Sequence, residues 1–268
     1  MKEFFGFGGY TRTPEGYFSF EHLAFVTSLM IIMTSLALFF GLRNRHKDDK
    51  AKTRVLIVSA ILIDSLELFK ILIFSWRGND PMAFLSELPL YLCSIQLITI
   101  PLAAFSKGRV REAAIDFVCI FGILGAVLGT YFAGQNYACY PVFSFDNVIS
   151  GVTHSISGFV SLYIAFAKLT KMKHRNIPIT LTILASFCIV AYIVNHILDM
   201  NYMFLMRGDG TPYDILFNLV NGNAVLYPIG VFLLFVLYIV AFYGTQFLIV
   251  RQRAKKGTKE SKKEALSV

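Results

Sequence analysis

The feature of this sequence that most restricts its fold is a series of apolar blocks, each about 20 residues long. A helix of about 20 apolar residues spans the hydrocarbon core of a bilayer, which is about 30 Å thick. Hydrophobic residues make up 56% of the chain, whereas about 45–50% is usual for a soluble domain. The sequence therefore predicts an all-α, polytopic membrane protein.

The spacing of the blocks predicts seven transmembrane helices. We expect them at residues 22–42, 55–76, 88–106, 113–133, 148–168, 178–199 and 226–250. No segment between the blocks is large enough for a soluble domain, so residues 1–250 are predicted to form one membrane domain. In the longest connecting segment, Thr211 and Pro212 are a typical N-cap and first helical residue. Asn221-Gly222 is a typical turn, so that a short interfacial helix is expected between them.

The basic residues predict the orientation of these helices. Of the 25 Lys and Arg residues, 20 lie in alternate segments on one side, at 43–54, 107–111, 168–175 and 251–268. Only four lie in the segments on the other side. Cytoplasmic loops carry an excess of Lys and Arg. The N-terminus is therefore predicted to lie outside and the C-terminus inside, in a multi-pass protein of a plasma membrane, with a bacterial origin expected.

The net charge of +8 follows from the same distribution. The end of the chain, "RQRAKKGTKESKKEALSV" at 251–268, is expected to be a basic cytoplasmic tail beside anionic lipid headgroups. Runs of like charge are common in solvated tails. Membrane lipids are therefore the expected partners, and nucleic acid is not.

Cysteine and histidine spacing gives no indication of a metal or cofactor. The four cysteines are Cys93, Cys119, Cys139 and Cys188, three of them within apolar blocks and none in a CxxC pair. No disulfide framework is expected from this spacing. A zinc site built from His154, His196, Asp199 and Glu67 is a less favoured alternative, because the apolar blocks contain no HxxxH motif.

Polar side chains at membrane depth are the candidates for a site, because they are costly there and tend to face a cavity or a partner. Four blocks contain such residues. Block 55–76 has Asp64, Glu67 and Lys70, block 88–106 has Cys93 and Gln96, block 148–168 has His154, and block 178–199 has Asn195, His196 and Asp199, with Asn201 just beyond it. In the predicted orientation they converge in the outer half of the membrane. We therefore expect an outward-facing polar pocket. Glu67 and Lys70 are spaced as an ion pair and could alternatively be structural.

Two chemistries fit such a pocket. Cys93 could be a nucleophile for acyl transfer or lipid hydrolysis, with His154 or His196 as base and Asp199 or Glu67 orienting the imidazole. The alternative for Cys93 is a small buried apolar residue. A different function, transport or binding of a polar solute, would centre on Asp64, Glu67 and Lys70. Gln96, Asn195 and Asn201 are expected to line the pocket in either case.

Small residues predict close helix packing at two places. One is the stripe of Ser150, Thr153, Ser157, Gly158 and Ser161 around His154, which is typical of helix contacts in membranes. The other is Gly125-x-x-x-Gly129, which could pack within the bundle or form the face of a homodimer. Packing within the bundle is the favoured interpretation.

Three stretches carry a resemblance to a known family: "LPLYLCSIQ" at 88–96, "THSISGFVSLY" at 153–163 and "NHILDMNYMFL" at 195–205. With the helix order and loop lengths of nearly the whole chain, they resemble the bacterial YwaF-like integral membrane family. The wider relatives of that family include transmembrane protein 164 of eukaryotes, regarded as a membrane acyltransferase that acts on lysophospholipids through a cysteine.

The sequence departs from the family pattern next to Cys93. The bacterial pattern reads Leu-Pro-Leu-His-Leu-Cys, and Tyr91 stands here in place of its histidine. In the eukaryotic relative the reactive cysteine directly precedes the histidine, so the matching positions are Leu90 and Tyr91, which can perform neither role. The resemblance therefore implies the fold and an outer pocket, and it does not carry the acyltransferase activity over.

Overall fold

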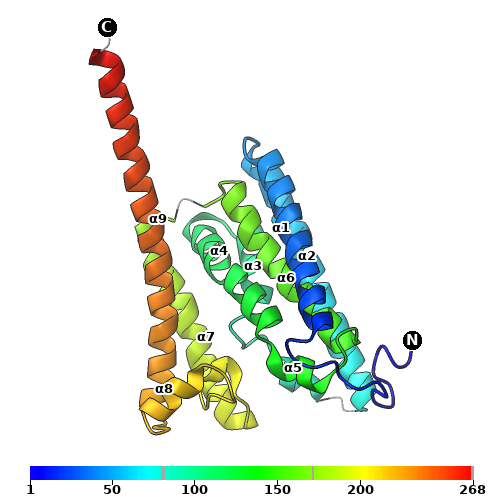
Figure 1. Cartoon of the computed structure of the whole chain (residues 1–268). Helices are drawn as coiled ribbons and strands as arrows, with labels where there is room; N and C mark the ends of the chain where they lie inside the picture. The colour runs from blue at the N-terminus through cyan, green and yellow to red at the C-terminus, as the bar shows by residue number, and fades with distance from the viewer. Residues whose placement is uncertain (80–81, 171, 267–268) are drawn as a thin grey trace. The chain divides into compact units, whose positions relative to one another are not determined.

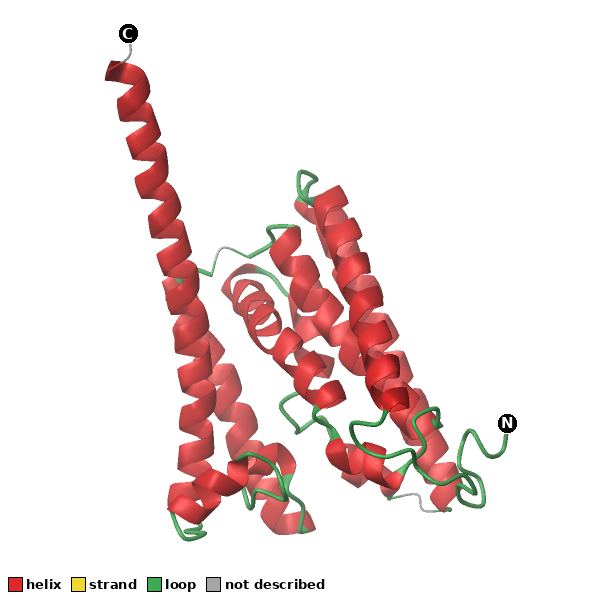
Figure 2. Cartoon of the chain, in the orientation of Figure 1, coloured by secondary structure: helices red, strands yellow, loops and turns green. Residues whose placement is uncertain are grey.

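The computed structural model describes residues 1–79, 82–170 and 172–266 (Figures 1 and 2), and this part of the chain consists of helices and loops. The elements are α1 Phe20–Asn44, α2 Asp49–Gly78, η1 Ala83–Glu87, α3 Gln96–Phe105, α4 Gly108–Tyr131, α5 Gly134–Cys139, α6 Phe145–Phe166, η2 His174–Asn176, α7 Ile177–Leu198, η3 Tyr202–Phe204, α8 Tyr213–Leu219 and α9 Leu226–Leu266. The prediction of an all-α protein is confirmed.

Five helical segments among the described residues are long and apolar enough to cross a membrane. They are Phe20–Asn44, Gly108–Cys139, Phe145–Phe166, His174–Leu198 and Leu226–Ile249. The chain is therefore a multi-pass membrane protein. The other two predicted spans fall on α2, which carries more charge, and on α3, whose ten residues reach only about 15 Å. The count of seven and the orientation stay predictions.

The predicted helix 88–106 is wrong over its first eight residues, since α3 begins only at Gln96. The chain bends at Pro89, where the Leu90 amide donates to the Leu88 carbonyl at 2.7 Å. A bond between residues two apart is that of a γ-turn, which suits the fixed φ of proline but cannot continue as a helix. Cys93 consequently lies in a turn that leads into α3, and not on a transmembrane helix.

The chain divides into two compact units. One comprises Met1–Lys171 with Asn176–Met203, and the other Met172–Arg175 with Phe204–Val268. In the second unit, the predicted short helix is present as α8, but it begins at Tyr213 with Pro212 at the N-cap, one residue later than predicted. Thr211 Oγ1 accepts from the Tyr213 amide at 3.3 Å. In the same unit, α9 runs on to Leu266, so the tail expected after residue 250 begins as a helix. That residues 1–250 form a single domain stays a prediction.

In the first unit α6 packs mainly against α4 and α1, while α3 packs against α4 and α2. Small residues allow the closest contacts. A Cβ added at Gly158 of α6 would lie 2.6 Å from Ala126 Cβ and 2.4 Å from Met33 Sδ, and one added at Gly122 of α4 would lie 2.7 Å from the Ser157 carbonyl. The polar stripe of α6 therefore contributes to helix packing, as predicted from the sequence.

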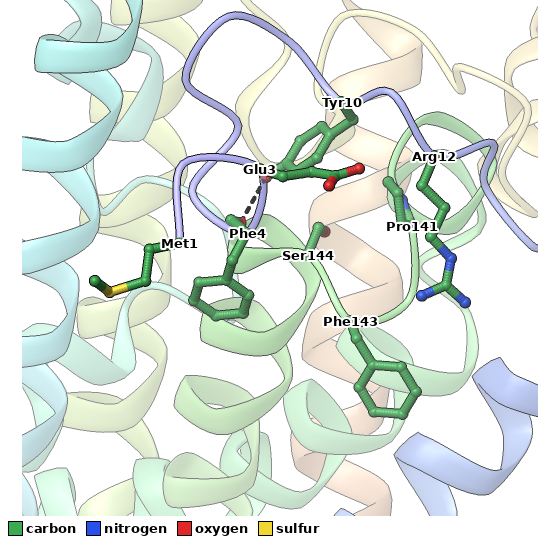
Figure 3. A pocket seen from close by; sticks show the side chains of 8 residues that line it. All are labelled: Met1, Glu3, Phe4, Tyr10, Arg12, Pro141, Phe143 and Ser144. Atoms are coloured by element: carbon green, nitrogen blue, oxygen red, sulfur yellow. Dashed lines mark hydrogen bonds between the residues drawn. The ribbon is translucent and has the colours of Figure 1, made fainter.

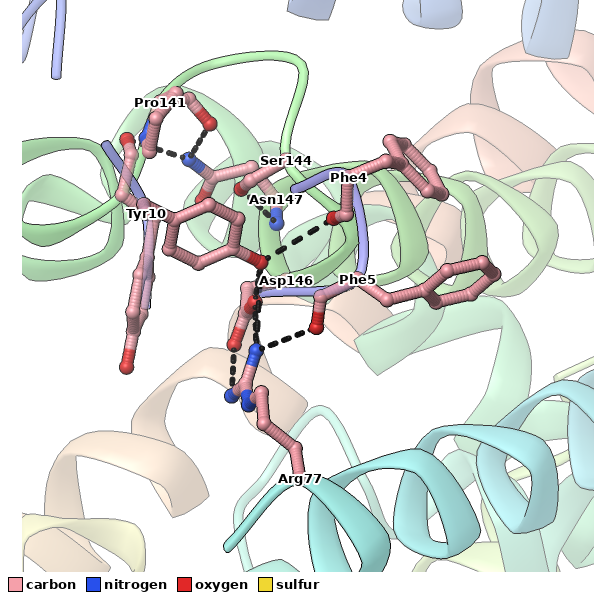
Figure 4. A network of polar contacts seen from close by, with 9 residues as sticks. Phe4, Phe5, Tyr10, Arg77, Pro141, Ser144, Asp146 and Asn147 are labelled. Atoms are coloured by element: carbon pink, nitrogen blue, oxygen red, sulfur yellow. Dashed lines mark hydrogen bonds and ion pairs between the residues drawn. The ribbon is translucent and has the colours of Figure 1, made fainter. Parts of the chain in front are cut away.

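An ion pair links the C-terminal end of α2 to the N-terminal end of α6 (Figure 4). Arg77 donates to both carboxylate oxygens of Asp146, at 2.6 and 2.8 Å. Tyr10, from the N-terminal segment, donates to the same carboxylate. Burial, and then the hydrogen bond to Asp146, raise the pKa of Tyr10 to about 12, so that it keeps its proton at neutral pH. The three side chains set the register of the two helices.

Replacing Arg77 with glutamine is expected to destabilise the fold by about 3 kcal/mol, because Asp146, only 6% exposed, would be left buried without its cationic partner. Thermal unfolding in detergent should then begin roughly 5–10 °C lower. The control is Arg207→Gln, which breaks the exposed pair with Asp209 and should change stability by less than about 1 kcal/mol. Equal shifts for the two variants would contradict the role given to Arg77.

Candidate functional site

A small pocket in the first unit brings three segments together. It is lined by Ile63, Glu67 and Lys70 of α2, by Cys93, Ser94 and Leu97 at the start of α3, and by Ser150, Thr153, His154 and Ser157 of α6. Its volume is about 50 Å³. A water molecule takes up about 30 Å³ in the liquid, so the pocket holds a group of the size of a carbonyl and its first neighbours.

The ion pair of Arg77 and Asp146 explains why α2 and α6 supply residues at the same level. Lys70 precedes Arg77 by seven residues, and His154 follows Asp146 by eight. At 1.5 Å per residue, Lys70 and His154 lie about 10 and 12 Å from the pair along their helices. Because α2 ends where α6 begins, both residues lie on the same side of it. The register fixed there therefore places both side chains in one pocket.

The main feature of the pocket is that the Cys93 thiol and the His154 imidazole line it together and interact electrostatically. Cys93 lies in the turn before α3, and His154 lies in the middle of α6. The two are 61 positions apart in the sequence, so spacing could not show that they meet. Among the described residues, the structure selects His154 as the histidine that can take the proton of Cys93.

The tautomer of His154 follows from its second contact. Its Nδ1 lies 2.8 Å from the carbonyl oxygen of Ser150. A carbonyl only accepts hydrogen bonds, so Nδ1 carries the hydrogen and donates it. The lone pair is then on Nε2, the nitrogen left for Cys93. A backbone carbonyl thus orients the imidazole, the role that the sequence assigned to Asp199 or Glu67.

His22 shows what a structural histidine looks like in the same protein. It is fully buried, its Nδ1 accepts from the Phe18 amide at 3.1 Å, and its Nε2 lies 3.2 Å from the Thr130 carbonyl. Both nitrogens are therefore used by the backbone. His154 differs, because only one of its nitrogens bonds to the backbone, and its imidazole lines the pocket with the Cys93 thiol.

The glycines of α4 give the two site residues their space. A Cβ added at Gly129 would lie 2.0 Å from Cδ2 and 2.1 Å from Nε2 of His154, and one added at Gly125 would lie 3.4 Å from Cys93 Cβ. Gly125 and Gly129 thus face residues of their own chain, in the packing favoured from the sequence. A homodimer stays untested, but these two glycines do not offer it a free surface.

Lys70 lies between two carboxylates at the side of the pocket. Its ammonium group is 2.7 Å from Glu67 Oε1 and 2.8 Å from Glu87 Oε2. The sequence predicted the pairing with Glu67, whereas Glu87 was not among the predicted site residues. Glu87 follows the apolar residues at the start of η1, and no periodic pattern in the sequence marked it as a site residue. The three charges hold α2 to η1 beside the thiol.

On α2 and α3, the predicted pocket residues Asp64 and Gln96 lie outside the pocket lining that the described residues form. Asp64 is half-buried, and its Oδ1 has no hydrogen-bond partner among the described residues. Gln96 is fully buried in the first turn of α3, where its Oε1 accepts from Thr99 at 3.1 Å. Gln96 was expected to line the pocket, but it lies outside the lining that contains Cys93.

The residues predicted at the end of α7 are not brought to Cys93. His196 and Asp199 are exposed there, with His196 Nδ1 against the Tyr192 carbonyl at 2.9 Å. Asn195 is buried and holds the next loop, since it accepts from the Tyr202 amide at 2.7 Å and donates to its carbonyl at 3.0 Å. Asn201 is buried in that loop. Asn195, predicted to line the pocket, therefore serves loop closure in the structure.

Tyr91, the residue at the position of the family histidine, points to this same loop. Its ring packs edge-on against Tyr202 with 5.0 Å between the centroids. Tyr91 therefore contributes to packing beside the pocket.

A larger pocket of about 290 Å³ lies at the N-terminal segment (Figure 3). It is lined by Met1, Glu3, Phe4, Tyr10, Arg12, Pro141, Phe143 and Ser144. This lining contains neither cysteine nor histidine, and Arg12 is paired with Glu15. The larger volume is therefore not the place where a thiol and a base meet. No group of three His, Cys, Asp or Glu side chains within the described residues is arranged to hold a metal ion.

Comparison with known families identifies the chain as a whole. The family model described as the TMEM164 family matches residues 17–250, which include the pocket and every predicted span. The chain belongs to the TMEM164 family. Neither the curated proteins nor the solved structures gave a match. The wider relationship expected from the resemblance is thereby confirmed at the level of the family, while the YwaF-like assignment stays a prediction.

Proposed function

We propose that this TMEM164-family protein transfers acyl groups of membrane lipids through a covalent intermediate on Cys93, with His154 as general base. The observation that carries the proposal is the meeting of the Cys93 thiol and the His154 imidazole in one pocket, with Nδ1 of His154 held by the Ser150 carbonyl. A nucleophile beside a base that a third group orients is the arrangement found in enzymes with an activated nucleophile.

The reaction would proceed in two steps. Nε2 of His154 takes the thiol proton, and Sγ attacks the carbonyl carbon of a lipid ester. A C–S bond forms, the ester C–O bond breaks, and His154 returns the proton to the departing alcohol. In the second step a lysophospholipid hydroxyl, or water in hydrolysis, gives its proton to His154 and attacks the thioester. The new C–O bond forms, the C–S bond breaks, and His154 returns the proton to the departing thiolate, which regenerates the thiol.

A lipid is the substrate class that the surroundings support. Helix α2, which supplies Glu67 and Lys70, carries large apolar side chains on its exposed side, among them Leu62, Phe69 and Leu72. Exposed apolar surface on a membrane helix faces acyl chains. The pocket has room for the reacting carbonyl group, so the remainder of the lipid would lie along the outside of the helices.

The competing proposal of solute transport has less support. It would centre on Asp64, Glu67 and Lys70, but Lys70 is paired with both Glu67 and Glu87. A solute pathway also needs a wider cavity than about 50 Å³, because ligand sites usually have volumes of about 300–1,000 Å³.

The membrane setting forms part of the proposal. In the predicted orientation the pocket belongs to the outer half of a plasma membrane, as in a YwaF-like bacterial protein with seven spans. The location of Lys and Arg in alternate segments supports this orientation.

A thioester on Cys93 is the expected intermediate and the test of the function. Purified protein would be reconstituted in phosphatidylcholine vesicles that carry a radiolabelled acyl chain. We expect label on the protein, released by hydroxylamine and mapped to Cys93 by mass spectrometry, and its transfer to added lysophosphatidylcholine or to water. Label at another residue, or none, would contradict the proposal, and uptake of solutes into the vesicles would then be tested.

A further inference from the structure

Four hydroxyl-bearing residues line the pocket, Ser94, Ser150, Thr153 and Ser157, and Ser157 differs from the others in its bonding. It follows His154 by three residues on α6, so the two side chains lie on one face of the helix. Ser157 lines the pocket and is only 3% exposed. Its hydroxyl has no hydrogen-bond partner among the described residues. A buried polar group without a partner is unusual and needs an explanation.

The neighbouring hydroxyls of α6 show that this is a particular feature of Ser157. Thr153 and Ser155 donate to the carbonyls four residues earlier, at 3.0 and 2.7 Å. Ser161 donates to the Cys119 carbonyl on α4 at 2.7 Å. These bonds are the usual ones for Ser and Thr in membrane helices. The hydroxyl of Ser157 alone in this group stays free, and it does so beside the thiol and the base.

We infer that Ser157 is a further catalytic residue, whose hydroxyl donates a hydrogen bond to the carbonyl oxygen of the lipid ester while Cys93 attacks. This inference rests on the proposed function. When the C–S bond forms, the π electrons of the carbonyl move to its oxygen, which becomes an oxyanion. The Oγ–H of Ser157 stabilises that charge and keeps its own proton. When the electron pair of the oxyanion re-forms the carbonyl double bond, the ester C–O bond breaks and His154 gives its proton to the departing alcohol.

The location favours a strong effect of such a donor. A hydrogen bond to an oxyanion in a site closed to water is worth more than one in water, and removing one such donor lowers kcat by about 10²–10³-fold in a well-studied protease. A hydroxyl that is unbonded before the substrate enters also breaks no existing bond when it donates. The small volume of the pocket keeps the carbonyl oxygen near the face of α6 that bears Ser157.

The test compares two reactions of Cys93 in Ser157→Ala. Alkylation by iodoacetamide needs the thiol and its base but forms no oxyanion. Acylation by p-nitrophenyl butyrate also needs the thiol and its base, and it does form an oxyanion. Both are measured in the full-length reconstituted protein on the peptide that contains Cys93. We expect acylation to fall about 10²-fold and alkylation to stay within about twofold. The control is Ser155→Ala, whose hydroxyl bonds within the helix and should affect neither reaction.

Stability provides the second readout. The hydroxyl of Ser157 makes no bond, so its removal should leave the thermal midpoint unchanged or slightly higher. A purely structural serine would lower it. Equal acylation in wild type and Ser157→Ala would overturn the inference alone, because the Cys93 chemistry would stand. Absence of acylation in wild type would overturn the proposed function and the inference with it.

Discussion

Replacing Cys93 with alanine is expected to lower acyl transfer between phosphatidylcholine and lysophosphatidylcholine by about 10⁴-fold or more. Loss of a nucleophile that forms a covalent intermediate removes the pathway itself, and catalytic nucleophiles in comparable systems show losses of this order or larger. The rate of transfer of a labelled acyl chain in reconstituted vesicles measures the effect. The fold should survive, since alanine differs from cysteine by one sulfur atom in a turn.

A matched control for this variant is Cys139→Ala. Cys139 is a free and exposed cysteine at the end of α5 and lies outside the pocket lining. Its replacement should leave the transfer rate unchanged. Full activity in Cys93→Ala would refute a role of this thiol and would direct attention to another nucleophile.

The pair of Cys93 and His154 should act as one unit. Replacing His154 with glutamine removes the base and is expected to lower the rate about 10³-fold. The double variant of Cys93→Ala with His154→Gln should be no slower than Cys93→Ala alone, because a base has no task without its nucleophile. Losses that multiply in the double variant would show that the two residues work independently.

Replacing Gly129 with alanine is expected to lower acyl transfer by about 10²-fold, because it displaces the imidazole. The new Cβ would lie 2.0–2.1 Å from Cδ2 and Nε2 of His154, a separation that neighbouring atoms do not tolerate. The ring must therefore move by about 1 Å or more. A misplacement of that size in a catalytic group costs about 10²-fold in rate. Transfer of the labelled acyl chain again gives the rate.

Gly125→Ala is the matched control on the same helix. Its Cβ would approach the nearest atom, Cys93 Cβ, at 3.4 Å, which is close to ordinary van der Waals contact. We expect nearly full activity. Both variants must also be compared by thermal unfolding, since Gly129→Ala should lose activity at a temperature at which it remains folded. Similar activities for the two variants would show that Gly129 does not determine the position of His154.

The sequence by itself determined the class of the protein and most of its helices. Apolar blocks of about 20 residues can be satisfied only by helices in a bilayer, because every backbone amide must be bonded within its segment. Local signals also identified α8 from Thr211 and Pro212, and the pairing of Lys70 with Glu67 from their spacing of three. Each of these features depends on neighbouring residues along one segment, and such features can be recognised from the sequence alone.

Only the tertiary structure decided which polar residues meet. Cys93 and His154 come from segments far apart in the sequence, and they meet because α3 and α6 both pack against α4, beside Gly125 and Gly129. The end of α7, with His196 and Asp199, carries equally suggestive residues, yet Asn195 serves there to hold a loop. Gln96 is fully buried in α3 outside the pocket lining, although it lies only three residues from Cys93. Each of these outcomes depends on packing between distant segments, which periodicity within a single segment does not encode.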